Sequence, residues 1–256
     1  MGEAREANVT VWPAAAAASA QNCIWQLPRK WSIRRLPRRL AAPGQAFCKA
    51  RTRRNRRPAM YIKTFLMDPL AVNSYLVWTA DGQALVVDCG GEPEAVLREI
   101  DARKLRLAAV LLTHLHPDHI LGVPELCRAT GAPALGPLAD AFLLGDLRPA
   151  LHLTDLAPGK RLLLDEPCLI LPTPGHTPGH LAFFFPKSFT AFTGDALFAG
   201  SVGRTDGPGG DAGLLLHSIR ERLLILPDAV ELFPGHGPTT TVGREKAENP
   251  FLTGGD

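Results

Sequence analysis

Residues 113–119 read Thr-His-Leu-His-Pro-Asp-His, so three histidines and an aspartate fall within six positions. Alternate residues of an extended loop point the same way, and His114 and His116 can therefore share one metal ion. Asp118 and His119 stand at the entrance of a predicted helix and can reach a second ion. Imidazole and carboxylate groups are the expected ligands of zinc, iron or manganese, so the stretch predicts a metal site.

This stretch lies between a predicted buried strand and a predicted helix. The apolar run Leu107–Thr113 leads into it, and Ile120–Thr130, closed by Gly131, follows it. In an alternative interpretation the stretch is an ordinary polar loop in which Asp118 only caps that helix. Three histidines packed this closely favour metal binding over that alternative.

Three more Gly-containing turns each follow a predicted strand, and each carries one further candidate ligand. The turns are Pro174–His180, Thr193–Asp195 and Pro234–Gly237, and their candidate ligands are His176, Asp195 and His236. Glycine lets the backbone turn sharply and bring a side chain to the end of a strand. We expect His180 to be structural or to support a ligand, and His152 and His217 to be ordinary histidines.

From Met60 onward, strand-like runs alternate with amphipathic helical patterns, which is typical of an α/β enzyme. Strands are predicted at Tyr61–Leu66, Ser74–Trp78, Ala84–Asp88, Arg161–Leu164, Cys168–Pro172, Leu181–Phe185, Thr190–Thr193 and Val230–Phe233. Helices are predicted at Glu92–Arg103 and Asp211–Leu226, with helix and loop over Ala139–Lys160. Asp81-Gly82 is a hairpin signal.

The first 59 residues differ from the rest in charge. They hold 13 Lys and Arg against two acidic residues, a formal charge of +11, whereas residues 60–256 hold 15 against 23, a charge of −8. We therefore expect a basic, disordered or non-native N-terminal extension, 1–59, and a hydrolase domain, 60–256. Three interpretations of the extension compete: an organelle-targeting peptide, a basic arm for nucleic acid or membrane, and an untranslated segment. The third is favoured because Met60 directly precedes the first strand pattern.

The cysteines and the hydropathy of the sequence indicate the cellular compartment of the protein. The five cysteines include no CxxC pair, which predicts reduced thiols in a cytoplasmic protein, with Cys89 and Cys168 in the core. No apolar run reaches the ~18 residues that span a bilayer, so no membrane association is expected. The acidic domain argues against a nucleic-acid partner.

The order of these elements resembles the metallo-β-lactamase superfamily. HxHxDH followed by PGH, GD and PGHG matches its pattern, and the likeness runs from Met60 to about Leu252. Within the superfamily the chain most resembles the short bacterial branch of glyoxalase II-like hydrolases, the hydroxyacylglutathione hydrolases. Residues 201–206 (Ser-Val-Gly-Arg-Thr-Asp) and 249–252 (Asn-Pro-Phe-Leu) also resemble that branch.

The resemblance implies a four-layer αββα sandwich of the α/β (α+β) class with two divalent metal ions, Zn²⁺ being the first expectation and Fe or Mn the others. The implied ligands of the first ion are His114, His116 and His176. Those of the second are Asp118, His119 and His236, with Asp195 bridging both. Asp88 would orient the histidine loop, or would only form a turn.

The implied activity is hydrolysis of a small-molecule thioester, such as S-D-lactoylglutathione, by a metal-bound hydroxide. Asp118 would be the catalytic residue that orients the nucleophile or receives its proton. Only 20 residues follow His236, too few for the helical region that binds glutathione in full-length glyoxalase II, so the thiol part of the substrate stays open. Arg204 could pair with a substrate carboxylate or with Asp206.

Other activities remain as alternatives. The nearest is a persulfide dioxygenase of the same superfamily, which would use a single iron. A β-lactamase is less favoured because no export signal is visible, and a nuclease because the domain is acidic. A hypothesis of another class is a non-catalytic nucleic-acid-binding scaffold that uses the N-terminal extension and binds in a salt-sensitive way.

Overall fold

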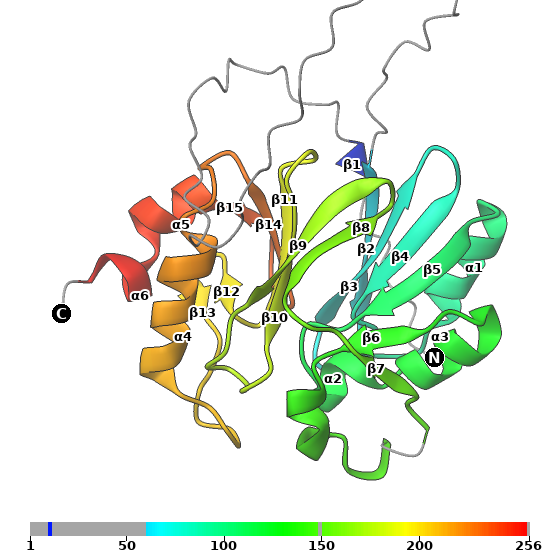
Figure 1. The fold of residues 1–256 in the computed structure, drawn as a ribbon, viewed down its shortest axis with the longest axis horizontal. Helices are drawn as coiled ribbons and strands as arrows, with labels where there is room; N and C mark the ends of the chain where they lie inside the picture. The colour runs from blue at the N-terminus through cyan, green and yellow to red at the C-terminus, as the bar shows by residue number, and fades with distance from the viewer. Residues whose placement is uncertain (1–9, 12–59, 148–149, 255–256) are drawn as a thin grey trace, which may run out of the picture. The chain divides into compact units, whose positions relative to one another are not determined.

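The computed structural model describes residues 10–11, 60–147 and 150–254, which form two large β-sheets with helices on their outer faces (Figure 1). One sheet is covered by α1 (Glu94–Ala102), α2 (Pro117–Ile120) and α3 (Val123–Thr130). The other is covered by α4 (Ala212–Ser218), α5 (Val242–Glu248) and α6 (Pro250–Thr253). The expected four-layer αββα sandwich is confirmed. The three interpretations of residues 1–59 fall outside the described residues, except that Thr10–Val11 forms β1.

The first sheet has its strands in sequence order. They are β1, β2 (Met60–Met67), β3 (Val72–Thr79), β4 (Gln83–Val87), β5 (Arg106–Leu111), β6 (Ala134–Gly136) and β7 (Leu153–Asp155). Strands β1 to β4 pair antiparallel, whereas β4 to β7 pair parallel. Parallel neighbours need a crossover connection, which α1 supplies between β4 and β5, and α2 with α3 between β5 and β6.

The second sheet has the order β15-β14-β11-β10-β9-β8. Its strands are β8 (Gly159–Leu163), β9 (Glu166–Pro172), β10 (Leu181–Phe185), β11 (Thr190–Gly194), β14 (Glu231–Pro234) and β15 (Thr240–Thr241). Only β11 and β14 pair parallel, through a connection that contains α4. A small hairpin of β12 (Leu197–Phe198) and β13 (Ser201–Val202) lies in that same connection.

Apolar side chains fill the space between the sheets and the space under each helical layer. Strand β10 shows the division: Phe183 and Phe185 join the core between the sheets, while Ala182 and Phe184 join the core under α4. This alternation follows from the two-residue period of a strand. Because both faces are covered, β10 is buried along its whole length, as is β3. The predicted core positions of Cys89 and Cys168 are confirmed, since both thiols are free and fully buried.

The structure corrects several predicted boundaries. The helix predicted over Ile120–Thr130 is divided into α2 and α3. Pro124 has no N–H to donate to the Ile120 carbonyl, so a continuous helix would lack that bond. At Gly122, an added Cβ would lie 2.0 Å from the Gly91 carbonyl oxygen, so backbone passes close by there.

The helix predicted over Asp211–Leu226 is likewise not uniform. It is α-helical only in α4 and continues as a π-helical turn, Ile219–Leu223. The segment Ala139–Lys160, predicted as helix and loop, holds two 3₁₀ helices (Leu138–Leu143 and Gly145–Leu147) and β7. The strands not predicted have two or three residues each: β1, β6, β7, β12, β13 and β15. The helices α5 and α6 were not predicted either. None of the described helices is long and apolar enough to cross a membrane.

Candidate metal centre

The candidate ligands meet because the strands that precede them end at one edge of the sandwich. Strands β9, β11 and β14 run in the same direction, since β9 and β11 both pair antiparallel with β10 and β11 pairs parallel with β14. The turns after these three strands carry His176, Asp195 and His236. The loop after β5, in the other sheet, carries the HxHxDH stretch. Residues up to 122 positions apart in the chain thus face one another.

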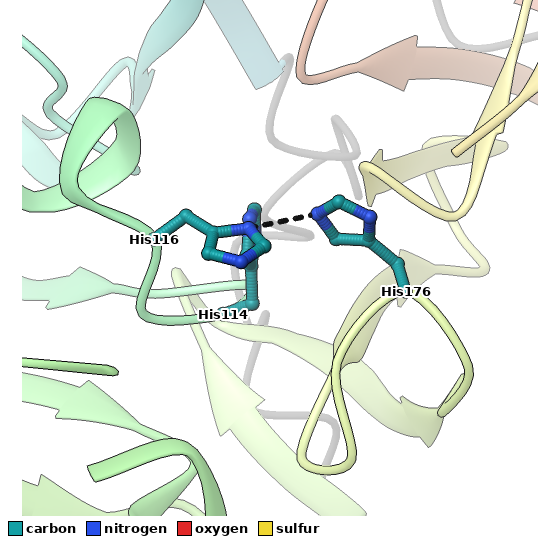
Figure 2. A group of neighbouring side chains, drawn as sticks. All are labelled: His114, His116 and His176. Carbon is teal, nitrogen blue, oxygen red and sulfur yellow. Dashed lines mark hydrogen bonds between the residues drawn. The ribbon is translucent and has the colours of Figure 1, made fainter. Parts of the chain in front are cut away.

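All seven predicted ligands lie in three overlapping groups. Within each group the potential ligand atoms lie within 4.8 Å of one another, and the groups are His114 with His116 and His176, His114 with His119 and Asp195, and Asp118 with His119 and His236. Figure 2 shows the first group, in which the His116 Nδ1 and His176 Nε2 atoms are 2.9 Å apart. The first and third groups match the two ligand sets that the sequence pattern implied.

Asp195 lies between the two sets. One of its oxygens, Oδ1, is 3.3 Å from His119 Nε2, and the other, Oδ2, is 3.7 Å from His176 Nε2 and 3.6 Å from His236 Nε2. A carboxylate in this position can contact ions held by either set. Gly235 lets the turn after β14 approach Asp195 closely, because a Cβ at this position would lie only 2.1 Å from Asp195 Oδ1.

Three buried polar atoms of the cluster make no well-aligned hydrogen bond within the described residues, although two of them lie 3.3 Å apart. They are His114 Nε2 and the neighbouring pair His119 Nε2 and Asp195 Oδ1. Leaving a buried polar atom unpaired costs roughly 1–3 kcal/mol. Nitrogen and carboxylate oxygen atoms that converge without hydrogen bonds are the donors that a divalent cation such as zinc takes. The residues present therefore fit a pair of metal ions.

Hydrogen bonds turn three histidine rings so that Nε2 faces the cluster. His176 Nδ1 donates to the Arg204 carbonyl oxygen at 2.7 Å. His119 Nδ1 lies 2.9 Å from Asp88 Oδ2, and His114 Nδ1 lies 3.0 Å from the Thr113 hydroxyl oxygen. Such partners set both the tautomer and the orientation of metal-binding histidines.

Asp88 fastens the histidine loop to the end of β4. Its buried carboxylate accepts hydrogen bonds from the Thr113 backbone N–H at 2.9 Å and from the Thr113 hydroxyl at 2.8 Å, besides contacting His119. Asp88 also has a positive φ of 55° at the turn, so both expected features of this residue are present. Asp118 does not cap α2: the cap position is His116, and no side chain bonds there.

His180 is buried beside the cluster and supports it. Its Nε2 accepts from the Asp195 backbone N–H at 3.1 Å, and its Nδ1 lies 2.8 Å from the Thr173 hydroxyl. Neither His152 nor His217 belongs to a potential metal-binding group within the described residues. The Arg204 carbonyl was not predicted as a contributor, and no sequence signal could have found it, because every residue has a carbonyl.

Electrostatics divides the cluster into neutral and charged groups. Burial lowers the pKa of His114, and burial lowers that of His116 to about 4. Burial also opposes the charged form of His119, but Asp195 and Asp88 outweigh it and raise its pKa. For Asp195, His119 and the other nearby histidines overcome burial and lower the pKa. His114 and His116 are thus neutral imidazoles and Asp195 is a charged carboxylate, which suits a divalent cation, whereas His119 would release a proton on binding one.

A cleft of about 630 Å³ opens onto the cluster. Its lining includes His116, Asp118, His176, Asp195 and His236, together with Leu70, Pro117, Phe198, Val202, Arg204, Gly207 and Pro208. Its walls are more apolar than polar. The exposed Arg204 guanidinium makes two hydrogen bonds to Asp206, at 2.7 and 3.1 Å, so the structure shows the second of its two predicted pairings.

This arrangement agrees with a comparison against known families. Residues 67–236 match the model of the metallo-β-lactamase superfamily. The chain belongs to that superfamily, and it is a metal-binding hydrolase by class.

Three individual proteins of known function or structure are similar to this chain. The chain is 39% identical over 202 residues to the hydroxyacylglutathione hydrolase GloC of Haemophilus influenzae, which covers 70% of this chain and 92% of that protein. The crystal structure of TTHA1623 in a di-iron-bound form is 39% identical, with a TM-score of 0.66 over 73% of this chain and 98% of that one. That of the BLEG-1 B3 metallo-β-lactamase is 33% identical, with a TM-score of 0.67 over 75% and 100%.

Proposed function

We propose that this protein is a two-metal hydrolase of small-molecule thioesters, with S-D-lactoylglutathione as the first substrate to test. The observation that carries the metal part is that Asp195 lies close to His176 of one ligand group and to His119 and His236 of the other. The similarity to a hydroxyacylglutathione hydrolase supports the thioester part. No part of the proposal requires nucleic acid or a membrane.

Seven residues would hold the metal ions. The first set is His114, His116 and His176, the second is Asp118, His119 and His236, and Asp195 would contact both ions. Two divalent cations supply Lewis-acid polarisation of a carbonyl group and lower the pKa of water. We propose Zn²⁺, with Fe or Mn as the tested alternatives, since the similar TTHA1623 was crystallised with two irons.

Asp118 is the proposed proton acceptor. Its carboxylate is half-buried in the cleft, with Oδ2 3.3 Å from His236 Nε2. Burial opposes the charged form, but the hydrogen bond from His236 and the charge of His119 keep the pKa of Asp118 low. A charged carboxylate here can orient a water molecule or receive its proton. The thiol that leaves a thioester has a pKa near ~8.5 and needs little help from an acid.

The rest of the cleft fits a substrate with an apolar arm and a charged end. Leu70, Phe198 and Val202 offer apolar surface, whereas Arg204 stands in the lining with its charge shared with Asp206. A substrate carboxylate could replace Asp206 as the partner of Arg204, because the pair is solvent-exposed. We place the protein in the cytoplasm, which the three free thiols in the described residues support.

The first experiment is metal analysis of the purified full-length chain together with hydrolysis assays. We expect about two metal ions per chain and turnover of S-D-lactoylglutathione. A nitrocefin assay covers the β-lactamase alternative, because the similar BLEG-1 is a metallo-β-lactamase. One iron per chain with oxygen uptake on glutathione persulfide, and no thioester turnover, would contradict the proposal in favour of the dioxygenase.

A further inference from the structure

Asp140 is a buried carboxylate outside the ligand set. It lies on the 3₁₀ helix Leu138–Leu143, in the segment that joins β6 to β7 (Figure 1), and its exposed fraction is 0%. Its oxygens accept hydrogen bonds at 2.6 Å from the Thr177 hydroxyl and at 2.6 Å from the Gly179 N–H.

Both donors belong to the turn after β9, in which Thr177 and Gly179 closely follow His176. The 3₁₀ helix that carries Asp140 follows β6, a strand of the other sheet. The carboxylate of Asp140 therefore joins the His176 turn of the second sheet to a segment of the first sheet, whose HxHxDH loop carries His114 and His116.

The packing around Asp140 leaves little room for other arrangements. A Cβ at Gly179 would meet Asp140 Oδ1 at 2.8 Å and Pro137 Cβ at 2.9 Å, so glycine allows the close approach. Thr177 is itself fully buried. Burial raises the pKa of Asp140, while the bonds from Thr177 and Gly179 oppose that rise. Burying a carboxylate is costly, which points to a specific use for its hydrogen bonds.

We propose that Asp140 is a positioning residue that holds His176 in the place the first metal ion needs. This inference rests on the metal centre of the proposed function, but not on its substrate. Asp88 contacts His119 of the second set and, through Thr113, also orients His114 of the first set. The hydrogen bonds of Asp140 go to the His176 turn, which carries a ligand of the first set. Loss of Asp140 therefore weakens the first site more than the second.

The test measures metal affinity of the full-length chain, stripped of metal by a chelator and titrated with Zn²⁺ against a chromophoric competitor. Asp140→Asn keeps the size of the side chain but presents an NH₂ group to one of the donors. We expect this substitution to lower the affinity for one of the two ions on the order of tenfold or more, the usual range for groups that support metal ligands. In a His116→Ala background, which already lacks the first site, Asp140→Asn should leave the remaining affinity unchanged.

Two further variants test the inference even if the Asp140→Asn protein does not fold. Thr177→Val removes one donor and should lower the affinity for the same ion. Thr177→Ser keeps the hydroxyl and should bind that ion as tightly as wild type. Glu166→Gln is the matched control. Glu166, at the start of β9, is also a buried carboxylate, and it accepts hydrogen bonds from the N–H and the hydroxyl of Ser188.

Equal affinities of wild type and Asp140→Asn would overturn the inference. So would an equal weakening of both ions, or a weakening that Glu166→Gln reproduces, because either would mark a general structural effect. A wild type that binds two ions but hydrolyses no thioester would contradict the proposed substrate and leave the role of Asp140 standing.

Discussion

At the residue scale, Thr113 connects two of the groups that orient the ligands. Its hydroxyl donates to Asp88, so the oxygen of that hydroxyl is free to accept from His114 Nδ1. Asp88 contacts His119 in turn, and one buried carboxylate thereby directs two histidine rings. Each ring then presents Nε2, the atom that makes no well-aligned hydrogen bond within the described residues.

The proposed role of Asp118 leads to a kinetic prediction. Asp118→Asn keeps the shape of the side chain but removes its negative charge and its capacity to accept a proton. We expect kcat for the thioester to fall by about 10²- to 10⁴-fold, the range of general-base contributions. Steady-state kinetics at saturating metal checks this, with Asp101→Asn, on the exposed face of α1, as the control. An unchanged kcat would remove Asp118 from the mechanism.

Glu231 leads to a prediction about stability and pH. Burial raises its pKa from 4.5 to about 7, and its Oε2 atom has no partner among the described residues. The unfolded chain releases this proton near pH 4.5, whereas the folded chain holds it to about pH 7, so stability falls as pH rises through this interval. Glu231→Gln should therefore unfold at higher urea concentration than wild type at pH 8. At pH 4 the two midpoints should agree; a constant difference at both pH values would contradict this cause.

At the scale of elements, the C-terminal helices support a wall of the cleft. Asn249, at the start of α6, donates to the Ser201 carbonyl at 3.1 Å and to Glu245 at 2.8 Å. Glu245 also accepts from the Gly200 N–H at 2.9 Å. These bonds reach the β12–β13 hairpin, whose Phe198 and Val202 line the cleft. The segment 249–252 thus acts through its contacts with this hairpin.

Removing the Asn249 side chain should affect substrate binding more than the rate of the chemical step. Asn249→Ala deletes the bond to the hairpin and one of the two bonds to Glu245 Oε2, and it leaves the partly buried Ser201 carbonyl without this donor, at about 1–3 kcal/mol of stability. We expect KM to rise on the order of tenfold, about 1.4 kcal/mol, with a smaller change in kcat. Glu248→Gln, which is exposed on the neighbouring helix α5, is the control for both assays. A fall in kcat at constant KM would place the effect on the ligands instead.

At the scale of the whole molecule, the candidate ligands come from both sheets. His114, His116, Asp118 and His119 come from the loop after β5, and the other three candidates come from turns of the second sheet. A metal ion held by side chains from both sheets binds the folded chain and not the unfolded one. Bound ions are therefore expected to stabilise the packing of the two sheets.

Metal removal tests this expectation without any substrate. An ion present at 100 times its Kd adds about 2.7 kcal/mol to the stability of the fold. For a chain of this size, each kcal/mol shifts Tm by roughly 2–4 °C. Chelation should thus lower Tm by at least about 5 °C, and added Zn²⁺ should restore it. The same Tm in both states, measured by calorimetry, would show that the cluster holds no ion.

The sequence by itself determined the kinds of candidate ligand, their order and the strands that carry them. Histidines and aspartates in Gly-containing turns after apolar runs are local signals, because a strand and its turn are encoded by neighbouring residues. The long strands of both sheets could be predicted for the same reason, since β-strand periodicity is visible over a few residues. Strands as short as β12 and β13 offer no such pattern.

Only the tertiary structure decided which groups hold the ligands in place. Asp140 lies 37 residues from Thr177, and the Arg204 carbonyl lies 28 residues from His176. Nothing in either residue's own neighbourhood marks its partner, because these contacts arise only when loops from different elements meet. The break between α2 and α3 is different, because Pro124 marks it in the sequence, whereas the close passage of Gly122 past the Gly91 backbone is seen only in the tertiary structure. Chemistry is encoded locally in this protein, whereas the geometry that makes it a site depends on how the sheets pack.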